Sequence, residues 1–130
     1  MQDTLLIVGH GSREIAGNVE IEQFAAQWRK QHPKWRIEVC FIEFSDVLLP
    51  DGLARAAQGS RRVLVLPLIL NAAGHVKMDI PQAIDAARLK HPGVQFAYAP
   101  HLGACDEILD VLRRRLRTAM QQLDMPDPRT

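Results

Sequence analysis

Cysteine is scarce in this 130-residue sequence. Its two cysteines, Cys40 and Cys105, lie far apart and form no C-x-x-C pair. Cysteine-rich patterns are typical of small secreted domains, whereas an isolated cysteine inside the cell behaves as a small hydrophobic side chain. We therefore expect two free thiols in a reducing compartment and no disulfide.

A long hydrophobic run and a secretory start are also missing. The longest apolar run, Val63–Leu70, is far shorter than the roughly 20 residues that a membrane-spanning helix needs. The start, Met1-Gln2-Asp3-Thr4, carries an acidic residue where a secretory signal peptide carries basic ones. The sequence thus predicts a cytoplasmic protein with no membrane partner.

Neither sign of charge is in excess. Sixteen basic residues face fifteen acidic ones, for a formal net charge of +1, whereas a general nucleic-acid binder carries a marked basic excess. One basic cluster, Arg113–Arg117, has two interpretations. It is either a nucleic-acid patch or a set of residues near a helix end that complement the helix dipole and face water. On the overall balance we expect no nucleic-acid partner.

Apolar residues make up 47% of the chain, enough for one well-packed domain but not for two. We predict one α/β domain over residues 1–123 and a frayed tail over residues 124–130. Strands are expected at residues 4–8, 37–44, 62–69 and 94–98. Helices are expected at residues 16–31 and 50–59. A third helix is expected to run to residue 90, with Asp79 as its cap and Pro81 in its first turn. The last helix is expected to carry one apolar stripe, formed by Ile108, Leu112, Leu116, Met120 and Leu123. This alternation predicts a parallel four-stranded sheet in three layers, of flavodoxin-like order 2-1-3-4.

Three of the five histidines follow predicted strands. His32 and His91 precede prolines at helix ends, whereas His10, His75 and His101 come after the first, third and fourth strands. Ligands of open parallel sheets bind at the carboxyl ends of the strands. In the order 2-1-3-4 the first and third strands are neighbours about 4.8 Å apart. His10 and His75 can therefore share one ligand, in loops whose flanking small residues leave space for a large molecule.

Other polar side chains fall near these two histidines. Glu43 lies at the end of the second predicted strand, either as part of the site or as an acid that faces solvent or caps the next helix. Two imidazoles and a carboxylate suit a divalent transition metal and can also accept protons. Ser12, Arg13 and Lys77 are candidate ligand-binding residues, and the two cationic side chains could bind ligand carboxylates. For Lys77 a solvated charge is the default interpretation.

Two motifs resemble a known family. Leu6-Ile7-Val8-Gly9-His10-Gly11-Ser12-Arg13 and Ala72-Ala73-Gly74-His75-Val76-Lys77-Met78-Asp79-Ile80-Pro81 are similar to those of the short CbiX-type sirohydrochlorin cobaltochelatases, class II chelatases related to ferrochelatase. The likeness runs from Leu5 to about Arg117. The second motif is the more specific of the two.

The resemblance implies a chelatase half-domain that inserts Co²⁺, or Fe²⁺ or Ni²⁺, into an open tetrapyrrole such as sirohydrochlorin, without a nucleotide. It implies that His10 and His75 hold the metal and take part in removing protons, and that Glu43 is the acidic residue after the second strand. Longer relatives carry two such halves in one chain, so the resemblance also implies a homodimer with the site between subunits.

Two other functions use the same features. A histidine phosphatase places a His-Gly after its first strand, but it needs an arginine just before that histidine, where this chain has Gly9. A non-catalytic carrier of metal or tetrapyrrole would share every residue named above and differ only in turnover.

Overall fold

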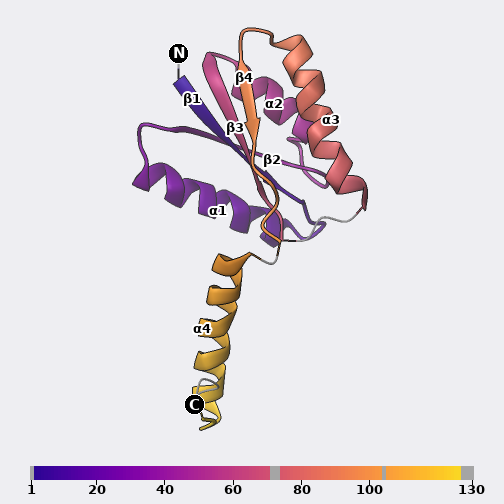
Figure 1. Ribbon diagram of the computed structural model, residues 1–130. Coiled ribbons are helices and arrows are strands. Elements are labelled where there is room, and N and C mark those ends of the chain that lie inside the picture. The colour runs from indigo at the N-terminus through magenta and orange to yellow at the C-terminus, as the bar shows by residue number, and fades with distance from the viewer. Residues whose placement is uncertain (1, 71–73, 104, 127–130) are drawn as a thin grey trace.

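The computed structural model describes the backbone of residues 2–70, 74–103 and 105–126, and the side chains of the same residues except 2 and 74–77. Four strands and four helices alternate along this part of the chain, and Figure 1 shows how they are arranged. The strands are β1 (Gln2–Gly9), β2 (Arg36–Phe41), β3 (Ser60–Leu68) and β4 (Gln95–Tyr98). The helices are α1 (Ile15–Gln31), α2 (Leu49–Ala57), α3 (Gly74–Lys90) and α4 (Asp106–Gln122).

The four strands form one parallel sheet in the order β2-β1-β3-β4. The predicted order and fold class are therefore confirmed. The central strands β1 and β3 are apolar on both faces, which is typical of parallel strands covered on two sides. Since β1 and β3 are parallel neighbours, the connections that follow them leave side by side from the same edge of the sheet.

Alternate residues of the sheet pack into two apolar clusters. Leu6, Val8 and Val65 lie in the cluster that includes α2 and α3, and Leu5 and Ile7 lie in the cluster with α1. Each fully buried side chain of this kind contributes roughly 1.5–3 kcal/mol to the free energy of unfolding. Among the described residues, the Cα atoms of α1 lie within 8 Å of β1 and β2 but of no other strand, so this helix covers about half of its face of the sheet.

Two predicted boundaries are wrong. β2 ends at Phe41 rather than at residue 44, because Phe44 adopts the left-handed backbone conformation (φ 55°) that ends a strand. α3 begins at Gly74 rather than after Asp79, and Pro81 lies inside it. Asp79 and Pro81 mimic a helix start, but a helix tolerates proline when its context compensates for the lost hydrogen bond. His75 is thus in the first turn of a helix and not in a loop.

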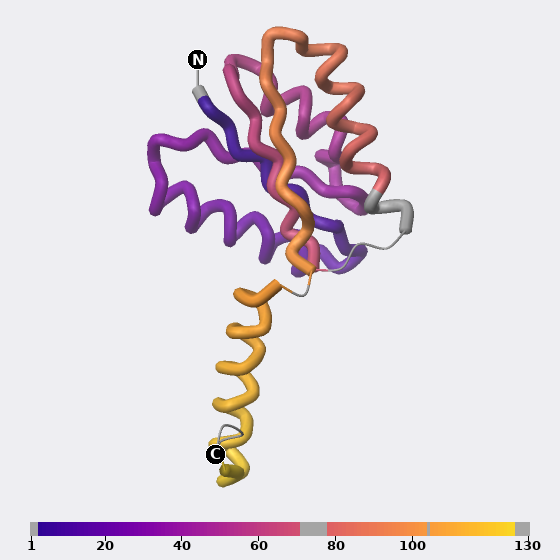
Figure 2. The backbone as a smooth tube through the Cα atoms, viewed as in Figure 1, coloured from indigo at the N-terminus to yellow at the C-terminus, as the bar shows by residue number. Residues whose placement is uncertain are grey.

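The last helix differs from the rest. α4 extends away from the rest of the chain, beyond the carboxyl edge of the sheet (Figure 1, Figure 2). None of its described residues is buried. The predicted frayed tail stays a prediction, since residues 127–130 lie outside the described part of the chain.

Candidate active site at the carboxyl edge of the sheet

The carboxyl edge of the sheet carries the residues that the sequence singled out. His10 follows β1 directly, Glu43 lies two residues after β2, and His75 is in the first turn of α3, which follows β3. The side chains of His75 and Lys77 lie outside the described residues, so their predicted roles stay predictions. His101 is in the connection after β4 and is half-buried.

His10 and Glu43 form a pair. His10 Nδ1 lies 3.6 Å from Glu43 Oε1, and the two side chains are 46% and 44% exposed. The same nitrogen lies 3.3 Å from the Gly11 carbonyl oxygen. Both oxygens can only accept hydrogen bonds, so they favour the tautomer that carries the proton on Nδ1. His10 Nε2 then keeps its lone pair for a metal ion or a proton.

Backbone hydrogen bonds hold this pair in place. The amide of Ile42 donates to the Gly9 carbonyl at 3.0 Å, and the amide of Glu43 donates to the His10 carbonyl at 3.2 Å. These bonds continue the β1–β2 pairing beyond the ends of both strands. Although Glu43 lies outside β2, its position beside His10 is therefore set by the sheet.

The glycine after His10 permits this close approach. Gly11 has a φ of 98°, a conformation that side chains disfavour, and a Cβ there would overlap the Glu43 carbonyl oxygen. A Cβ on Gly9 would lie 2.9 Å from the Phe41 ring. The structure thus corrects the interpretation that both glycines leave space for a ligand: the chain that follows β1 packs against the end of β2 and the loop after it.

Sequence reasoning missed Asn18. Its Oδ1 accepts from the Ser12 amide at 2.9 Å, and its Nδ2 donates to the Phe44 carbonyl at 2.8 Å. Asn18 therefore joins the loop of His10 to the loop of Glu43. The sequence gives no sign of this bridging role, since the two hydrogen-bond partners of Asn18 lie 6 and 26 residues away from it.

Ser12 and Arg13, both predicted to bind ligand, have local contacts. Ser12 Oγ accepts from the Glu14 amide at 3.1 Å, just before α1. The Arg13 guanidinium lies over the Phe44 ring, 5.0 Å from its centre, and Arg13 is exposed. This cation–π contact orients the arginine along the edge of the site and leaves its N–H groups accessible to solvent.

We expect Asn18→Ala to loosen the two loops. The substitution removes both hydrogen bonds, which predicts a loss of about 1–2 kcal/mol in the free energy of unfolding, measured by urea denaturation. Hydrogen exchange at the Ser12 amide should accelerate. Asn18→Asp is the matched control, because it still accepts from Ser12 and should protect that amide. Unchanged exchange in Asn18→Ala would contradict the bridging role.

The described side chains include no group of three or more His, Cys, Asp or Glu residues that could hold a metal ion. Among them, His10 and Glu43 supply two potential ligands. A site with two protein ligands binds a metal ion weakly enough to release it. Cys40 is fully buried in the core cluster that includes α2 and α3, where burial raises the pKa of its thiol to about 12. This fits the prediction that Cys40 is a small hydrophobic core residue, and both cysteines are free.

The sequence model of the CbiX family matches residues 4–119. The chain belongs to the CbiX family. The resemblance seen in the two histidine motifs is thereby confirmed, and the match extends from β1 through most of α4.

The sequence similarity of this CbiX-family chain to its relatives covers most of the chain. It is 36% identical over 124 residues to the sirohydrochlorin cobaltochelatase of Priestia megaterium, covering 95% of this chain and 40% of that protein. It is 28% identical over 134 residues to the sirohydrochlorin cobaltochelatase of Methanothermobacter thermautotrophicus, covering 89% of this chain and 92% of that protein. The chain thus spans less than half the length of the first of these relatives.

A solved structure has the same fold. The sirohydrochlorin chelatase SirB of Bacillus subtilis subspecies spizizenii, in complex with cobalt, superposes with a TM-score of 0.79 at 28% identity, over 91% of this chain and 51% of that one. In the part of the chain that the structure describes, we also find no helix long and apolar enough to span a membrane.

Proposed function

We propose that this CbiX-family chain inserts a divalent metal ion into sirohydrochlorin or a similar tetrapyrrole without a nucleotide, with Co²⁺ as the first candidate and Fe²⁺ or Ni²⁺ as others. The observation that carries the proposal is the His10–Glu43 pair at the carboxyl edge, with His10 Nε2 left available. The names of the relatives support the choice of substrate. The cytoplasmic location stays a prediction of the sequence.

The chemistry requires a weak metal site and a base. Metal insertion replaces two pyrrole N–H protons by one divalent ion, so the site must release the ion and accept two protons. Neutral imidazole can ligate a metal and accept a proton, and a carboxylate can accept a second proton. We assign metal ligation and acceptance of the first proton to His10 with His75. We assign acceptance of the second proton to Glu43, which lies beside His10.

We assign substrate binding to the basic rim of the site. Sirohydrochlorin carries eight carboxylates, and Arg13 presents accessible N–H groups beside the pair. Lys77, in the first turns of α3, and Ser12 are the other assigned contacts. A single domain offers one wall to a flat macrocycle, so we also propose a homodimer in which a second copy supplies the other wall.

The proposal is tested by an absorbance time course of sirohydrochlorin with each metal, with and without the protein. We expect the protein to accelerate formation of the metal complex over the uncatalysed rate with at least one of the three ions. Binding of metal and tetrapyrrole without acceleration would identify a carrier instead.

Glu43→Gln separates proton transfer from binding. The amide keeps the size of the side chain but cannot accept a proton, so we expect insertion to slow by about 10²-fold or more. The dissociation constant of sirohydrochlorin, measured by fluorescence quenching, should change little. The matched control is Glu22→Gln, at an exposed position on α1. Equal insertion rates for Glu43→Gln and the unmodified chain would remove Glu43 from the mechanism.

A further inference from the structure

Phe44 lies next to Glu43 in a backbone conformation that phenylalanine rarely adopts. Its φ of 55° is in the left-handed region, which glycine and asparagine adopt readily and bulky residues do not. The side chain is also 46% exposed, so burial in the core does not account for it. Neither backbone preference nor packing therefore explains a phenylalanine at this position. Residues held in such conformations cluster at active sites and at sites that clamp a ligand.

The side chain of Asn18 holds Phe44 in this conformation. Its Nδ2 donates to the Phe44 carbonyl at 2.8 Å, and its Oδ1 accepts from the Ser12 amide at 2.9 Å. One side chain of α1 thus fixes the backbone of Phe44 and the backbone of the residue just before Arg13. The result is that Arg13 and Phe44 lie side by side, with the guanidinium carbon 5.0 Å from the centre of the ring.

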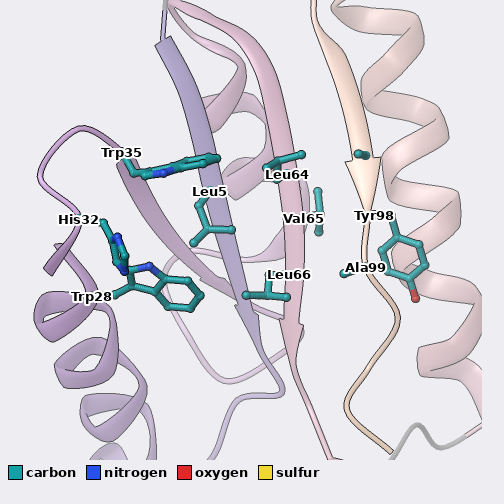
Figure 3. A pocket seen from close by; sticks show the side chains of 10 residues that line it. Leu5, Trp28, His32, Trp35, Leu64, Val65, Leu66, Tyr98 and Ala99 are labelled. Carbon is teal, nitrogen blue, oxygen red and sulfur yellow. The ribbon is translucent and has the colours of Figure 1, made fainter. Parts of the chain in front are cut away.

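The Phe44 ring is separate from the aromatic side chains on the face of the sheet. Trp28, Trp35 and Tyr98 line a cavity of about 480 Å³ between α1 and β3–β4 (Figure 3), and Phe44 is not among the residues that line it. The contact that the structure shows for the Phe44 ring is the one with Arg13. We therefore relate the unusual conformation of Phe44 to Arg13.

An arginine that is already oriented binds a carboxylate at a lower cost. A free arginine side chain samples many rotamers, and the freedom that it loses on binding weakens the affinity. The cation–π contact restricts Arg13 before the ligand arrives and leaves its N–H groups accessible. Among the described side chains, none of the ion pairs includes Arg13, so its charge is available to a ligand.

We propose that the Phe44 ring positions the Arg13 guanidinium for a carboxylate of the tetrapyrrole substrate. Sirohydrochlorin carries its carboxylates on the rim of the macrocycle, whereas the metal enters at the centre. A carboxylate bound by an oriented Arg13 fixes the macrocycle relative to Glu43, which directly precedes Phe44 in the chain. The inference rests on the proposed function and adds to it a positioning residue, which acts through Arg13 and not on the reacting atoms.

Binding of metal-free sirohydrochlorin, measured by isothermal titration calorimetry, tests the role of Phe44 without turnover. Phe44→Leu keeps an apolar side chain without a ring, so we expect the dissociation constant to rise by roughly 2- to 5-fold, the usual strength of an exposed cation–π contact. Phe44→Tyr keeps the ring and should bind like the unmodified chain. Phe24→Leu is the matched control, because Phe24 lies on α1 and is similarly exposed, at 42%.

Two further comparisons separate positioning from direct contact and from a structural effect. In an Arg13→Ala background, Phe44→Leu should not weaken binding further, because no guanidinium is left to position. With saturating sirohydrochlorin, Phe44→Leu should insert metal as fast as the unmodified chain, so that KM rises and kcat does not change. A displaced Glu43 would instead lower kcat.

Phe44→Asn keeps the test valid if Phe44→Leu fails to fold. Asparagine adopts the left-handed conformation readily, so this variant should unfold at the same urea concentration as the unmodified chain, or a higher one, and still bind more weakly. Unchanged affinity in both variants, the same loss of affinity in the Arg13→Ala background, or a lower kcat would overturn the role of Phe44 and leave the proposed function standing. An unmodified chain that binds no sirohydrochlorin would overturn both.

Discussion

Replacing His10 by alanine should abolish metal insertion while the fold stays intact. The substitution removes Nε2, the atom to which we assign metal binding and proton acceptance, and loss of a general base typically costs 10²- to 10⁴-fold in rate. Because the side chain is 46% exposed, its loss creates no core cavity. We therefore expect a rate near that of the uncatalysed reaction and an unchanged unfolding transition.

The matched control is His91→Ala, since His91 follows α3 at the opposite edge of the sheet. This variant should insert metal at the rate of the unmodified chain. His10→Asn adds a second comparison, because it keeps a polar side chain but supplies no base. Near-normal turnover in His10→Ala would show that the site lies elsewhere, and loss of the unfolding transition would indicate a structural role for His10.

A single methyl group on Gly11 should have an effect of similar size without touching a reactive side chain. A Cβ at this position would overlap the Glu43 carbonyl oxygen, and the φ of 98° is strained for alanine. The two loops must then separate, which moves His10 away from Glu43. We expect an insertion rate at least about 100-fold lower, since positioning errors of about 1 Å cost this much.

The free energy of unfolding of Gly11→Ala should also fall, by about 1–3 kcal/mol, as is typical of a strained backbone position. Gly93→Ala is the matched control, because a Cβ there meets no atom within 4 Å and the turn before β4 is far from the site. That variant should be as stable as the unmodified chain and as active. Full activity in Gly11→Ala would show that the separation of His10 and Glu43 does not matter.

Apolar patterning alone was sufficient to predict the sheet. Continuous apolar runs at β1 and β3 indicate strands, and the proline after His32 marks the end of α1. Once four strands alternate with helices, handedness rules leave few orders, and the predicted one is present. The carboxyl edge, and with it His10 and Glu43, then follows from topology.

Boundaries that depend on contacts between distant residues could not be predicted in this way. β2 continues in sequence as Ile42, Glu43 and Phe44, which look like strand residues. In the structure the Phe44 carbonyl accepts from Asn18, 26 residues earlier, and the chain turns there. α3 likewise begins before the apparent cap at Asp79, because tertiary context overrides a local start signal.

The sequence by itself determined the fold class, the strand order, the motifs of the CbiX family and the edge of the sheet that carries His10 and Glu43, because these depend on local periodicity and on general rules of chain connection. Only the tertiary structure decided that Gly11 serves a close approach of two loops, that Asn18 joins them and that α4 leaves its own domain. The physical reason is that each of these depends on the relative positions of segments far apart in the chain. The apolar residues of α4 have the same spacing in the sequence whether or not the helix packs against its own sheet.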